Sequence, residues 1–128
     1  MSYCFTKALK LPFGEAVERV IDQFKQRGFG VLSDIDVKAT LKKKLGVDFQ
    51  NYRILGMCNP PNAYKALSAE PNIGVMLPCN AVVYEQGDHT VLSIIRPTVA
   101  MQAVGNDELG PVATYIEGEL KAVFDSLH

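Results

Sequence analysis

Two cysteines, each followed by an asparagine, are the residues of this sequence best suited to chemistry. Cys58 and Asn59 end one apolar segment, and Cys79 and Asn80 begin another. If these segments are antiparallel strands, paired directly or across one neighbour, the two thiols and the two amides meet at one edge of the sheet. A helix is expected to begin at Pro60, and its N-terminus would favour a negatively charged group and so lower a nearby thiol pKa.

Four uses of this cluster stay open. Both cysteines could be small buried core residues, with the asparagines capping or turning the backbone. The cluster could line a pocket for a small molecule, or hold a soft metal such as copper(I) with Cys58 and Cys79 as ligands. The two thiols could instead form a reversible disulfide or carry a transferred sulfur group. Nucleophilic catalysis is disfavoured, because no histidine lies near enough in the sequence to activate a thiol.

Three other polar residues are candidates for a site. Tyr84 lies in a predicted strand from which its hydroxyl could reach the same pocket, so it joins the candidate ligand-binding residues. Asp34 and Asp36 are two residues apart and could bind a hard cation together, but Asp36 is better placed to cap a helix. No catalytic residue, cofactor or metal is assigned, and no glycine-rich phosphate loop is present.

Hydrophobic periodicity predicts the elements that must position these residues. Two long amphipathic helices and about five strands, largely antiparallel, indicate a single two-layer α+β domain over residues 1–128, with the helices backing the sheet. The expected strands are 2–9, 30–35, 51–58, 80–85 and 90–96, the long helices are 12–27 and 107–127, and shorter helices are 37–45, 60–69 and 98–104.

The two hairpin strands suggest a second subunit. The segments 81–84 and 91–95 alternate poorly between apolar and polar residues, which indicates that both faces of the sheet are covered. The helices cover one face, and a second copy of the chain would cover the other, so we predict a homodimer. The alternative is that the connecting segments 59–78 and 97–106 fold over that face.

Composition narrows the class of protein. The chain has 128 residues, a formal net charge of −1 and 48% hydrophobic residues, which is typical of a globular domain and disfavours a nucleic-acid binder. No apolar run is long enough for a membrane span, and the N-terminus lacks the pattern of a signal peptide. An odd number of cysteines, three, without that signal favours a reducing compartment, so we expect a cytoplasmic protein.

Three stretches carry a resemblance to a known family: residues 28–38, residues 52–60 with Cys58-Asn59-Pro60, and residues 77–84 with Pro78-Cys79-Asn80. Together they resemble the bacterial and archaeal family known as domain of unknown function 302. The resemblance implies a curved antiparallel sheet backed by two helices, similar to the fold of the TATA-binding protein, and a tendency to dimerise. It implies no particular activity, because the family is named for lacking one.

These observations favour a non-catalytic homodimeric binding protein for a small molecule or a soft metal. Its predicted site consists of Cys58, Asn59, Cys79, Asn80 and Tyr84. A thiol-dependent redox or sulfur-handling protein that uses the same cysteines is the first alternative. A purely structural or interacting subunit is the second.

Overall fold

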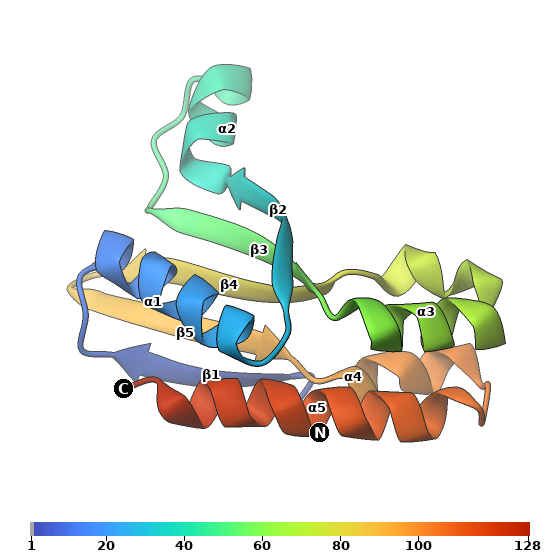
Figure 1. Ribbon diagram of the computed structural model, residues 1–128. Coiled ribbons are helices and arrows are strands. Elements are labelled where there is room, and N and C mark those ends of the chain that lie inside the picture. Colours follow the sequence, from blue (N-terminus) through green and yellow to red (C-terminus); the bar gives the residue numbers. More distant parts are fainter. Residues whose placement is uncertain (1) are drawn as a thin grey trace.

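The computed structural model describes residues 2–128 and shows a five-stranded, fully antiparallel sheet with the strand order β1-β5-β4-β3-β2. The sheet is open, and helices pack on it to form a two-layer α+β fold (Figure 1). In chain order the elements are β1 (Cys4–Leu9), α1 (Phe13–Gln26), β2 (Gly30–Asp36), α2 (Val37–Leu45), β3 (Tyr52–Cys58), α3 (Pro60–Ala69), the 3-10 helix η1 (Pro71–Met76), β4 (Cys79–Gln86), β5 (His89–Ile95), α4 (Pro97–Ala100), the 3-10 helix η2 (Met101–Val104) and α5 (Leu109–Ser126).

The main core lies between the sheet and the two long helices. Alternate strand residues such as Leu55, Val83 and Leu92 are buried because they point toward these helices. The helices contribute apolar stripes at helical spacing, Val17, Val20 and Phe24 from α1 and Ile116, Leu120 and Val123 from α5. The two long helices are therefore amphipathic and pack their apolar faces against the sheet, as predicted.

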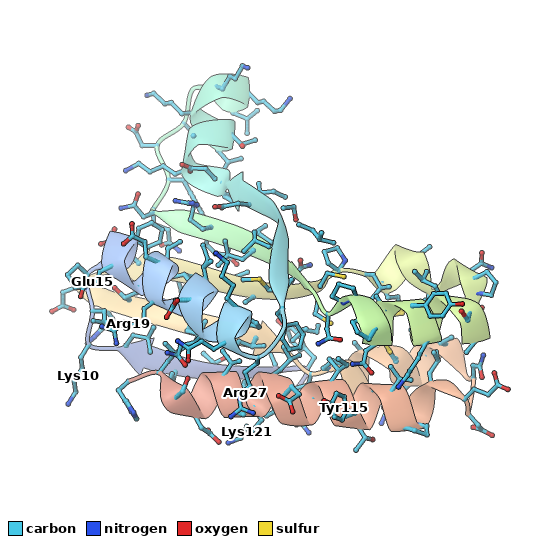
Figure 2. All side chains as sticks on the ribbon, viewed as in Figure 1. Lys10, Glu15, Arg19, Arg27, Tyr115 and Lys121 are labelled. Atoms are coloured by element: carbon cyan, nitrogen blue, oxygen red, sulfur yellow. The ribbon has the colours of Figure 1, made fainter. Side chains whose placement is uncertain are left out.

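The two long helices also contact each other. Arg27, which follows α1, lies against α5 (Figure 2), and its guanidinium donates to the carboxylate of Glu119 at 3.1 Å. The Lys7 ammonium donates to the carbonyls of Phe124 and Leu127 at 2.6 and 2.7 Å, and so satisfies acceptors at the C-terminus of α5. These bonds fix α5 along the edge of the sheet.

A helical lobe extends past the end of the strands. Figure 1 shows α3, α4 and the N-terminal half of α5 side by side beyond the sheet. This lobe has its own apolar cluster, centred on Ala66, Ile73 and Leu109, and Val112 packs against both clusters. The lobe arises because α5 is longer than the strands, so its first turns need other elements to bury their apolar side chains.

The second face of the sheet has no helix over it in residues 2–128. Tyr52, Ile54, Val82 and Tyr84 point to this face and are all partly exposed, whereas Leu55, Ala81 and Val83, which point to the helix side, are buried. The connecting segments 59–78 and 97–106 do not cover this face but build the helical lobe. Coverage of both faces, as the strand pattern predicted, thus does not occur within one copy of the chain.

The helix α2 stands apart from the other helices, at the far end of β2 and β3 (Figure 1). It contains no buried residue. Leu45, Val47 and Phe49, at its end and in the connection that follows, are between 40% and 69% exposed. None of the helices within residues 2–128 combines the length and the apolar character needed to cross a bilayer.

Candidate functional site

An apolar cavity of about 300 Å³ lies between the end of the sheet and the helical lobe. The sheet closes one side of it, α3 and α5 form two walls, and residues of η1, α4, η2 and the connection 77–78 complete the lining. The lining residues are Phe29, Leu32, Met57, Cys58, Asn59, Asn62, Ala63, Ala66, Leu67, Gly74, Leu77, Pro78, Cys79, Pro97, Met101, Val112, Ala113 and Ile116. The lining therefore includes residues of both apolar clusters, among them Met57 and Ala66.

Cys58 and Cys79 reach the cavity because β3 ends and β4 begins there. Met57 is the cross-strand partner of Cys79, so Cys58 lies one residue beyond that pair on the neighbouring strand. Both cysteines are partly buried and have free thiols. The structure thus places the two cysteines close together where β3 and β4 meet the cavity, as predicted.

Asn59 connects the end of β3 to the helix α3. Its side-chain oxygen accepts hydrogen bonds from the backbone N–H of Asn62 at 3.3 Å and from the side-chain amide of Asn62 at 2.8 Å. Its own amide donates to the carbonyl of Gly28 at 3.4 Å. Asn59 is therefore an N-cap of α3, and these bonds hold the helix against the start of β2.

The electrostatic environment of the Cys79 thiol differs from the expectation for a reactive cysteine. Burial raises the pKa of the Cys79 thiol to about 11, and the neighbouring Cys58 adds to the shift. Desolvation disfavours the thiolate, which is the nucleophilic form. At neutral pH the Cys79 side chain is consequently a neutral thiol, and the N-terminus of α3 does not lower its pKa.

No charged side chain lines the cavity among the residues that the structure describes. An ionised ligand group would lose its hydration there without gaining a partner of opposite charge. Within residues 2–128, no group of three or more histidine, cysteine, aspartate or glutamate side chains is placed to hold a metal ion. The cavity is suited to an uncharged, mainly apolar molecule.

Asn80 and Tyr84 lie outside the lining of the cavity. Both point to the uncovered face of the sheet, where Asn80 is paired with Gly56 and the Tyr84 ring stacks on the Tyr52 ring at a centroid distance of 5.2 Å. The reason is the alternation of side chains along β4, which directs Cys79 to the helix side and its neighbour Asn80 to the other. The structure thus brings together Cys58, Asn59 and Cys79 but not all five predicted residues.

Sequence reasoning missed the residues that form most of the cavity. Ala63, Ala66 and Ala113 are small, and they leave space between α3 and α5 that larger side chains would fill. Met57 and Met101 also line the cavity and were not singled out. The small residues of α3 were a usable signal, but nothing in the sequence showed that α5 would lie opposite them.

Glu117 fixes the segment that enters the lobe from β5. One carboxylate oxygen accepts from the Thr98 N–H at 3.0 Å and from the Thr98 hydroxyl at 2.6 Å, and the other accepts two bonds from the Arg96 guanidinium at 3.2 Å. Burial alone would raise the pKa of Glu117, but the bonds from Thr98 and Arg96 together lower it. This network positions Pro97, a lining residue, against α5.

The two aspartates Asp34 and Asp36 form no shared site. The Asp34 carboxylate pairs with the guanidinium of Arg53 on the neighbouring strand, and this bond lowers the pKa of Asp34. The Asp36 carboxylate accepts from the N–H of Ala39 at 2.9 Å and caps α2. The predicted capping role of Asp36 is confirmed, and Asp34 lies within β2.

Comparison with known proteins identifies relatives that share this fold. The family described as domain of unknown function DUF302 matches residues 5–127. The crystal structure of an uncharacterized conserved protein DUF302 from Bacillus stearothermophilus is similar with a TM-score of 0.93 and 32% sequence identity, and the similarity covers 100% of each chain. No curated protein matches the chain.

Proposed function

This chain belongs to the DUF302 family, and we propose that it is a non-catalytic, homodimeric binding protein for an uncharged, mainly apolar small molecule held beside Cys58 and Cys79. The observation that carries the proposal is the cavity of about 300 Å³ with no charged lining residue. Its size lies at the lower end of the range of small-molecule pockets, which begins at about 300 Å³. Clusters of apolar side chains on both sides support a cavity of defined shape.

The neutral state of Cys79 supports binding rather than thiol chemistry. A redox or sulfur-transfer role needs a thiolate near neutral pH, whereas the pKa of Cys79 is raised to about 11. A soft metal would have to displace the proton of this buried thiol. An uncharged molecule is therefore a better-supported ligand than copper(I). Thermal unfolding in the presence of Cu(I) tests the metal alternative, and alkylation of Cys79 tests the redox alternative.

Ligand-dependent thermal unfolding with matched variants tests the binding proposal. Ala63→Phe places a ring in the cavity, and Ser68→Phe adds the same ring to the exposed part of the same helix, outside the lining. A compound at 100 times its dissociation constant stabilises the folded state by about 2.7 kcal/mol. We expect uncharged aromatic or aliphatic compounds to raise the melting temperature of the wild type and Ser68→Phe but not of Ala63→Phe. A response only to Cu(I) would favour the metal, and equal responses of all three proteins would refute the proposed site.

The uncovered face of the sheet supports the homodimer. Partly exposed apolar and aromatic residues from neighbouring strands, among them Ile54, Val82 and the stacked pair Tyr52 and Tyr84, form a continuous surface on it. Apolar surfaces of this kind are typical of subunit interfaces, and a two-fold contact would place the same surface on itself. The exposed apolar residues that follow α2 would add to such a contact.

Sedimentation equilibrium over a range of protein concentrations tests this interface. We expect a dimer for the wild type and a monomer for Tyr84→Lys, because a lysine ammonium in the contact would lose its hydration. Tyr64→Lys is the matched control, since Tyr64 lies on α3 and is 74% exposed. A wild type that remains monomeric at high concentration, or a Tyr84→Lys dimer, would refute the interface.

A further inference from the structure

Sulfur atoms are concentrated around the cavity. The chain has three cysteines and four methionines, and four of these seven side chains, Met57, Cys58, Cys79 and Met101, line it. They come from the ends of β3 and β4 on one side and from η2 in the helical lobe on the other. A guest in the cavity therefore meets polarisable sulfur from both the sheet and the lobe.

An aromatic ring also lines the cavity. Phe29 is 2% exposed, and its ring is held edge-on by Phe24 at a centroid distance of 5.6 Å and an interplanar angle of 79°. A fixed ring offers an aromatic guest a surface for offset or edge-to-face contact. Sulfur atoms add favourable contacts with aromatic rings that they do not make with saturated carbon.

Size and charge limit the guest further. The cavity of about 300 Å³ is twice as large as an apolar cavity of roughly 150 Å³ that accommodates benzene. Two fused rings match this volume better than one ring. Because none of the described lining residues is charged, a carboxylate, phosphate or ammonium group of a ligand would have no partner of opposite charge in the cavity.

We propose that the ligand is an uncharged aromatic molecule of about two fused rings, selected by the sulfur side chains and by Phe29. The inference rests on the proposed binding function and names the ligand class for the same cavity. The methionine thioethers contact the faces or edges of the rings, and the sulfur atoms of Cys58 and Cys79 pack beside them. Saturated molecules of equal size fit the space but lack the sulfur–aromatic contribution.

Methyl NMR of the protein with labelled methionines tests the proposal, with naphthalene and decalin as probes of similar size. Naphthalene should move the methyl signals of Met57 and Met101 by its ring current, and Met76, which is outside the lining, should not respond. Titration of each probe gives its dissociation constant. Because the two hydrocarbons differ in solubility, their dissociation constants are not compared with each other. The test is how much a variant changes the dissociation constant of each probe.

Met101→Leu removes a sulfur with little change in volume. We expect it to weaken naphthalene binding about two- to tenfold and to leave decalin binding unchanged, while Met76→Leu changes neither. Met57→Leu is the second variant if Met101→Leu fails to fold. Equal effects of Met101→Leu on both probes would overturn the aromatic selection but retain the site. Absence of binding of both probes to the wild type would overturn the proposed function itself.

Discussion

Replacement of Gly56 by alanine tests the close packing where β2, β3 and the start of β4 meet. A Cβ atom at Gly56 would lie 2.3 Å from the Ser33 hydroxyl oxygen and 2.6 Å from Cγ of Pro78, whereas ordinary contacts begin at 3.4 Å. The Ser33 hydroxyl can rotate away. The Pro78 ring has to move by about 0.8 Å, and it directly precedes Cys79 at the cavity.

The cost follows from these distances. Overpacking of this kind destabilises the folded state by about 1–3 kcal/mol. Alanine also lowers the conformational entropy of the unfolded chain, which offsets about 0.4–1 kcal/mol of this loss. The expected net loss is about 1–2 kcal/mol. For a chain of 128 residues, the entropy of unfolding is about 0.27 kcal/mol per degree, so the melting temperature should fall by about 4–7 °C.

Thermal and urea unfolding of Gly56→Ala should be compared with Gly30→Ala. Gly30 is also a strand glycine with a negative φ, but no atom lies within 4 Å of its added Cβ. We expect Gly30→Ala to be neutral or slightly stabilising. Ser33→Ala should recover part of the loss when combined with Gly56→Ala, because it removes one of the two close contacts. If Gly56→Ala is as stable as Gly30→Ala, the described packing is wrong.

Three further predictions concern a cap, a partly buried carboxylate and a thiol. Asp36→Ala should destabilise by about 1 kcal/mol in urea unfolding through loss of the α2 cap, and an unchanged midpoint would contradict that role. Glu117→Gln should destabilise by about 2 kcal/mol at pH 7. Because the pKa of Glu117 is lowered by folding, its contribution is fully present above the ordinary value of 4.5 and is lost as pH falls through the lowered pKa. As the pH is lowered, the free energy of unfolding of Glu117→Gln should therefore fall less than that of the wild type. Plots of unfolding free energy against pH that run parallel for the two proteins would refute this. Cys79, whose pKa is about 11 against an ordinary 9.0, should have about 100-fold less thiolate at pH 8 than in the unfolded chain. Its alkylation, followed by peptide mass spectrometry, should be correspondingly slow, and rapid reaction below pH 7 would favour the redox alternative.

The strands and helices were predictable because local patterns determine them. The stripe in α1, the cap at Asp36 and the helix start after Asn59 all rest on residues that are neighbours in the sequence. The meeting of Cys58 and Cys79 was predictable too, because it needs only antiparallel pairing of two strands that are close in the sequence. The family membership agrees with the resemblance drawn from the motifs around these cysteines.

The cavity was not predictable from such patterns. It depends on how α5 extends past the sheet and where Ala113 and Ile116 come to lie opposite α3, which are contacts between segments far apart in the sequence. Asn80 and Tyr84 were included because of their position in the chain, but the alternation along β4 turns both away from Cys79. Proximity in sequence was therefore a poor guide to which residues share the site.

Xenon binding to crystals of the protein tests the central claim most directly, because apolar cavities that stay dry take up xenon. We predict an anomalous xenon peak between Met57, Ala66 and Ile116 in the wild type and no peak at this place in Ala63→Phe. A wild-type crystal with no xenon there, or with a chain of ordered waters through the cavity, would contradict the assignment of this cavity as a site for an uncharged apolar molecule.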